Sequence, residues 1–189
     1  RNPKSWTNRL FGILALLNNA YIIINFLSLH PPQETPENQL FWIRMVMFIT
    51  SFIGPVLILL VHTFPRERVA MRPRYLILLG LLMLTSASFA LSDLIFKSIE
   101  YPNGEPIPVA GAGIPVFFAD FVGLFILSFI LLIYKYQKAV GEEKIRHLHL
   151  FLGILASFSL MGLTTVTFVV LLKTSAFVYL GPIFPVILA

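Results

Sequence analysis

Three charged side chains, Arg44, Asp93 and Asp120, lie inside long apolar runs of the sequence. A charge in the middle of a membrane-crossing helix costs about 3 kcal/mol or more, so each is a candidate for binding or signalling chemistry. If the apolar runs are helices, all three lie roughly 5–8 Å below the same membrane surface. They could pair, or line a polar pocket for a ligand or a proton. Alternatively, Arg44 extends to the headgroups and both carboxylates sit at hydrated helix ends.

Amide side chains form a second group, because the first apolar run contains Asn18, Asn19 and Asn25. Amides inside a span usually form hydrogen bonds with neighbouring helices, and less often they line a pore or a pocket. We therefore add Asn18 and Asn19 to Arg44, Asp93 and Asp120 as hypothetical ligand-binding residues.

Two apolar runs contain helix breakers, Gly54-Pro55 in the second run and Gly181-Pro182 in the last. Proline removes a backbone hydrogen bond and kinks a helix, and a kink can serve as a hinge. Gly54, Pro55 and Pro182 are therefore hinge candidates, although proline is also common in helices that do not move.

Catalytic and metal-binding patterns are not recognisable. The chain has no cysteine, which excludes disulfides and thiolate metal sites. His147 and His149 are two residues apart, so on a helix they face different directions and cannot share a metal ion. No HExxH motif, phosphate-binding loop or Ser-His-Asp set can be defended. We expect no metal, no cofactor and no enzymatic activity in this segment.

The elements that position these residues follow from composition. Hydrophobic residues make up 57% of the 189 and charged residues only 12%, against about 25% charged in soluble domains. The sequence predicts an all-α fold, a single transmembrane helix bundle over residues 1–189. We expect five complete spans and part of a sixth, at about 10–29, 40–63, 75–96, 116–134, 147–172 and 177–189.

Charged loops predict the orientation of this bundle. Most of its 14 lysines and arginines lie before the first span and in the second and fourth loops. Because such loops stay cytoplasmic, the Arg1 end is expected inside the cell and the loops at about 30–39 and 97–115 outside it. The basic charge is explained by this membrane face, and no aromatic-basic surface for nucleic acid is recognisable. The expected partner is the lipid bilayer.

Several stretches resemble a known family: NPKSWTNRLFGILAL before and into the first span, FWIRMVMF and VHTFP around the second, YPNGEPIPVAGAGIP, and LGPIF near the end. Together they resemble the N-terminal seven-transmembrane-helix region of bacterial sensor histidine kinases, over nearly the whole chain. The resemblance implies that residues 1–189 are helices two to six and part of seven. It also implies a bacterial inner-membrane location, homodimers, and a cytoplasmic kinase or diguanylate-cyclase module after the last helix. Arg44 lies in the matching FWIR motif.

We therefore expect a membrane-embedded signal-input domain that responds to an unknown small molecule or membrane signal. Two alternatives stay open, a transporter or channel subunit and a structural subunit of a larger membrane complex. A transporter would need polar residues that continue to the middle of the bilayer, and apart from the asparagines of the first span the chain offers few.

Overall fold

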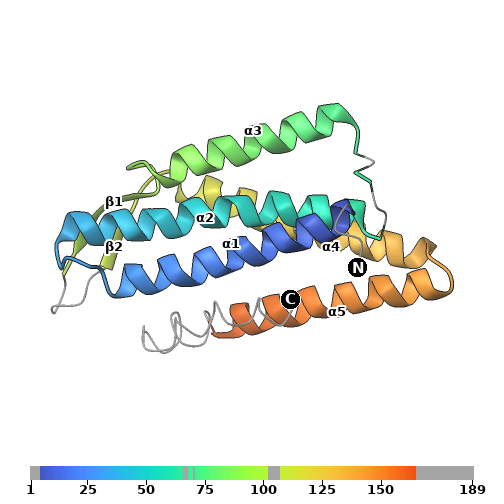
Figure 1. Cartoon of the computed structure of the whole chain (residues 1–189). Helices are drawn as coiled ribbons and strands as arrows, with labels where there is room; N and C mark the ends of the chain where they lie inside the picture. The colour runs from blue at the N-terminus through green and yellow to red at the C-terminus, as the bar shows by residue number, and fades with distance from the viewer. Residues whose placement is uncertain (1–4, 66–67, 70, 102–106, 165–189) are drawn as a thin grey trace.

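The computed structural model describes residues 5–65, 68–69, 71–101 and 107–164 (Figure 1). These residues form five helices and one two-stranded sheet. The helices are α1 (Trp6–Leu29), α2 (Pro36–Thr63), α3 (Pro73–Ala90), α4 (Ile114–Lys138) and α5 (Glu142–Thr164). The strands are β1 (Phe96–Glu100) and β2 (Ile107–Ala110).

The predicted helical membrane bundle is confirmed at this level, because α1, α2, α3 and α4 are each long and apolar enough to cross a membrane. The finer prediction of five complete spans and part of a sixth is not confirmed. The described part of α5 begins with the charged turn Glu142–Arg146 and is not among these four candidates. The expected sixth run at 177–189 lies outside the described residues.

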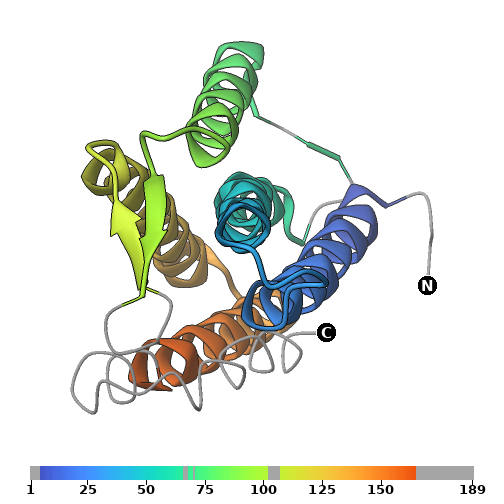
Figure 2. The ribbon, with the colours of Figure 1, turned by 90° about the vertical axis from the view of Figure 1, so that its left-hand side faces the viewer.

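Helix α2 occupies the centre of the bundle. Viewed along the helices, the other four surround it (Figure 2). Leu57, Leu60 and Val61 on α2 are almost completely buried, and they pack in one cluster with Leu14 of α1 and Leu132 of α4. The outward sides of α3 and α4 instead expose large apolar side chains. An apolar exterior of this kind is stable against lipid and not against water.

Several helices extend beyond their predicted bounds because polar residues at their ends continue the helical backbone. Helix α4 was expected to stop near residue 134 and runs to Lys138, with Lys135 and Lys138 in its last turn. Helix α5 was expected from residue 147 and starts at Glu142, with two acidic residues in its first turn. Basic residues at the end of α4 and acidic residues at the start of α5 both interact favourably with the helix dipoles.

Helix α3 is shorter than predicted, and here the expectation of a span to residue 96 is wrong. It ends at Ala90, and a turn leads into β1. Strand β1 pairs antiparallel with β2, with Phe96 opposite Ala110 and Glu100 opposite Ile107. Part of the predicted loop at 97–115 is thus a hairpin, followed directly by α4.

The two ends of the bundle therefore differ. The hairpin end holds β1, β2, the end of α3 and the starts of α2 and α4 (Figure 1). The basic end holds the starts of α1, α3 and α5 and the ends of α2 and α4.

Candidate functional site

Arg44 of α2 makes the main polar contacts at the hairpin end. Its Nε and Nη2 donate hydrogen bonds to the backbone carbonyl of Phe96, at 3.2 and 2.6 Å. Its Nη2 also pairs with a carboxylate oxygen of Asp93. The Arg44 side chain is 18% exposed and that of Asp93 is 82% exposed. The pair thus combines a mostly covered cation with an open carboxylate, and we call it with the Phe96 carbonyl the hairpin-end cluster.

Glycine makes the turn of this cluster possible. A Cβ at Gly111 would lie 2.1 Å from the Leu94 carbonyl oxygen, so only glycine fits there. The amides of Gly111 and Gly113 donate to the carbonyls of Ile95 and Leu94, at 2.6 and 2.7 Å. The backbone of the turn is held on one side by these amides and on the other by the guanidinium of Arg44.

Of the three predicted charges, only Arg44 and Asp93 meet. Asp93 follows the end of α3, so its expected position within a span is wrong. Asp120 lies in α4, and its carboxylate accepts a hydrogen bond of 2.5 Å from the Ser86 hydroxyl of α3. Asp120 therefore links α3 to α4 and does not join Arg44.

The predicted asparagines do not contribute hydrogen bonds to the hairpin-end cluster. Asn18 is buried on α1, and among the described residues no hydrogen-bond partner of its side chain is found. Asn19 is exposed and donates to the carbonyl of Ala15 in its own helix, at 2.9 Å. The expected interhelical bonds of these two amides are absent from the described part of the chain.

The hinge candidates have a packing role in the structure. Helix α2 stays helical through Pro55. A Cβ at Gly54 would lie 3.1 Å from a Leu124 methyl carbon, so this glycine lets α2 and α4 approach closely. The hinge hypothesis for Gly54 and Pro55 remains a prediction, and Pro182 lies outside the described residues.

Sequence reasoning missed a polar group at the basic end. The Lys135 ammonium of α4 donates to the carbonyls of Val61, His62 and Phe64, at 2.8, 2.5 and 2.7 Å. An ammonium has three N–H groups, which matches these three acceptors in number. Lys135 thereby caps the free carbonyls at the end of α2, where the helix dipole favours a cation. The sequence had shown this lysine only as an orienting loop charge.

His147 of α5 is the buried polar side chain beside this cap. It is 1% exposed, and its ring packs edge-on against Phe64 with centroids 5.4 Å apart. Its Nδ1 lies 2.8 Å from the Glu143 carbonyl oxygen. Its Nε2 and the hydroxyl of the buried Thr63 have no hydrogen-bond partner in the described structure. Buried polar atoms without partners are rare and call for an explanation.

A cavity of about 310 Å³ opens at this place, between the ends of α2 and α4 and the start of α5. We call it the basic-end cavity. Its polar lining consists of Tyr134, Lys135, Lys138, Glu143 and His147. The apolar part of its wall is formed by Phe64, Pro65 and Ala139.

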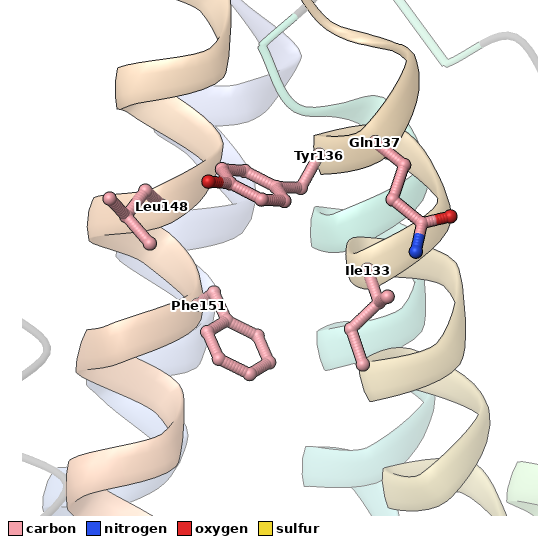
Figure 3. A pocket seen from close by; sticks show the side chains of 5 residues that line it. All are labelled: Ile133, Tyr136, Gln137, Leu148 and Phe151. Atoms are coloured by element: carbon pink, nitrogen blue, oxygen red, sulfur yellow. The ribbon is translucent and has the colours of Figure 1, made fainter.

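A second cavity, of about 250 Å³, lies between α4 and α5 (Figure 3). Tyr136 of α4 extends toward α5 across the gap, where Leu148 and Phe151 project from α5. Ile133 and Gln137 complete the lining, which is mostly apolar. This cavity offers packing space and no reactive group.

The described residues contain no group of three His, Asp or Glu side chains placed to hold a metal ion. Comparisons with protein-family models, with curated proteins and with solved structures find no match for this chain.

Proposed function

We propose that this chain is the membrane-embedded signal-input domain of a histidine kinase of the two-component type, or of a related signalling protein. The observation that carries the proposal is the placement of α2. This helix supplies Arg44 to the hairpin-end cluster and receives Lys135 on its last carbonyls at the basic end. One central helix therefore connects two polar contacts on opposite ends of the bundle.

The proposed mechanism uses the open carboxylate of Asp93. A cation, or a ligand carrying one, that binds Asp93 competes with Arg44 for it. Arg44 would then shift relative to the turn around Phe96. The helix between Arg44 and Thr63 is about 28 Å long and tightly packed near its end, so it would carry the displacement to the basic end.

In this proposal the basic end faces the cytoplasm of a bacterium and the hairpin end faces outward, because basic loops stay inside. The Arg1 end is then cytoplasmic, and the loops at about 30–39 and 97–115 are external. An output module would follow on the cytoplasmic side, and the working unit would be a homodimer.

The transporter alternative has less support from the described interior. A transport path needs polar groups across the bilayer, whereas α2 buries Leu57, Leu60 and Val61 toward the basic end. A structural subunit would have no use for coupling between the two ends, so a coupling experiment separates it from a sensor.

The test measures coupling in the full-length protein with the substitution Arg44→Gln. These 189 residues contain no cysteine, so a single cysteine at the exposed Val140, with any cysteine elsewhere in the full-length protein replaced by serine, reports on the basic end through its alkylation rate. We expect Arg44→Gln to change both that rate and autophosphorylation several-fold. Lys97→Gln, an exposed substitution on β1, should change neither.

Unchanged alkylation and autophosphorylation in Arg44→Gln, with the protein still folded by its thermal unfolding curve, would falsify the sensor proposal. A solute flux in liposomes that Arg44→Gln abolishes would instead establish the transporter alternative.

A further inference from the structure

From the basic-end cavity we infer a binding site for the headgroup of an aminophospholipid, a phosphate joined to a primary ammonium. The inference goes beyond the proposed function and does not depend on it. It rests on the unpartnered nitrogen of His147, on two opposite charges in the cavity lining, and on the position of the cavity at the helix ends.

The hydrogen bond of His147 determines which partner its ring needs. A carbonyl oxygen only accepts, so Nδ1 carries the hydrogen that is donated to Glu143. In the neutral ring Nε2 is then an acceptor, and it lacks a donor among the described residues. The described hydrogen bonds of the Lys135 ammonium go to the carbonyls of Val61, His62 and Phe64, at the end of α2 and just after it. Within the described ranges nothing supplies this donor, and a molecule bound in the cavity would supply it.

The cavity also carries one available charge of each sign. Lys138 is exposed, and its one described hydrogen bond, to the Tyr134 hydroxyl, leaves two N–H groups. Glu143 is exposed, and no described cation lies within ion-pair distance of its carboxylate, since Arg146 pairs with Glu142. A ligand with a phosphate for Lys138 and an ammonium for Glu143 and His147 satisfies all three groups. A choline headgroup has no N–H to donate, and a glycerol headgroup has no cation.

The position of the cavity identifies the source of this headgroup. Its walls are the residues that directly follow α2, the last turn of α4 and the first turns of α5, and α2 and α4 are two of the helices that can cross a membrane. Lipid headgroups lie at the ends of such helices. The volume of about 310 Å³ is at the lower end for small-molecule sites, which suits a headgroup. The apolar wall around Phe64 would contact its carbon atoms.

The experiment counts lipids retained by the full-length protein in native mass spectrometry. The protein is released from nanodiscs that contain phosphatidylethanolamine, phosphatidylcholine and phosphatidylglycerol in equal amounts with the same acyl chains. We expect phosphatidylethanolamine to be retained roughly tenfold over phosphatidylcholine, as the loss of one charge-assisted hydrogen bond predicts. Glu143→Gln and Lys138→Gln should each remove most of this preference.

Glu142→Gln is the matched control, because Glu142 is an exposed neighbour that does not line the cavity, and its preference should equal that of the unmodified protein. Both cavity substitutions are at exposed positions, and thermal unfolding checks that they fold. Equal retention of the three lipids would overturn the inference, as would a preference for phosphatidylglycerol or an equal loss in Glu142→Gln. Binding of free O-phosphoethanolamine without retention of the lipid would show a soluble ligand and would also overturn it.

Discussion

The two ends of the bundle are both held by a cation, but the cations work in different ways. At the hairpin end, Arg44 divides its donors between the Phe96 carbonyl and the exposed carboxylate of Asp93. At the basic end, Lys135 donates to the backbone carbonyls of Val61, His62 and Phe64, where α2 ends. A competitor in solution can reach the exposed carboxylate of Asp93, whereas the described partners of Lys135 are backbone carbonyls. The ion pair at the hairpin end is suited to partner exchange, and the hydrogen bonds at the basic end are suited to holding the helices together.

The largest expected effect comes from breaking the backbone support of the hairpin end. Gly111→Ala would place a Cβ against the Leu94 carbonyl, so the turn or the start of α4 must move. We expect the free energy of unfolding to fall by about 3 kcal/mol, the upper end for overpacking. Thermal unfolding in detergent measures it. Gly123→Ala is the control: nothing lies within 4 Å of its Cβ position, and a gain of roughly 0.5–1 kcal/mol is expected.

Removing the cap at the basic end should cost slightly less. Lys135→Met approximately keeps the length of the side chain and leaves the carbonyls of Val61, His62 and Phe64, at the end of α2 and just after it, without this donor. We expect a loss of about 2 kcal/mol in unfolding free energy and faster hydrogen exchange at the end of α2. Lys138→Met, one turn away and exposed, should lose only about 0.5 kcal/mol through the helix dipole and should leave hydrogen exchange at the end of α2 unchanged. Equal losses in both variants would contradict the cap.

In the hairpin-end cluster, substitutions of Arg44 and of Asp93 should lower the unfolding free energy by different amounts. Arg44→Gln weakens the bonds to the Phe96 carbonyl and should lower the unfolding free energy by about 1 kcal/mol. Asp93→Asn removes only an exposed ion-pair partner and should cost less than about 0.5 kcal/mol. If Asp93 receives the signal, its variant should nevertheless alter output in the full-length protein. A larger stability loss in Asp93→Asn than in Arg44→Gln would reverse this assignment.

The smallest effect is expected between the two ends, where Ser86 donates to Asp120. Ser86→Ala should cost about 0.6 kcal/mol, the usual value for a polar contact between helices in a membrane. Thr85→Ala is a matched control, because the Thr85 hydroxyl bonds only within α3, to Leu81. A loss well above 1 kcal/mol in Ser86→Ala would indicate that Asp120 has further partners.

Hydropathy was enough to predict α1, α2 and α4, because a membrane-crossing helix needs only length and apolar side chains. It failed at the end of α3, since Leu91–Phe96 is mostly apolar as well. The turn there is stabilised by the amides of Gly111 and Gly113, about 20 residues later in the chain. Contacts over such a separation leave no local signal.

The candidate site shows the same limit. Equal depth along three helices predicts that Arg44, Asp93 and Asp120 could pair, and the structure pairs Arg44 with Asp93 although Asp93 follows the end of α3. Depth alone does not show in which direction Asp120 projects from α4. Its hydrogen-bond partner is Ser86 and not Arg44. Sequence spacing relates His147 only to the nearby His149, whereas the structure packs its ring against Phe64.

The Lys135 cap also restricts how α2 can move. Free carbonyls exist only at the end of a helix, so α2 cannot slide along α4 by a turn and find the same three acceptors again. A tilt of α2 about the Lys135 contacts would keep those bonds. In the proposed mechanism, a displacement at Arg44 would reach the basic end as a change in the angle of α2 about the Lys135 contacts. This change of angle would act at the basic end on α4 and α5, the two helices that line the cavity there.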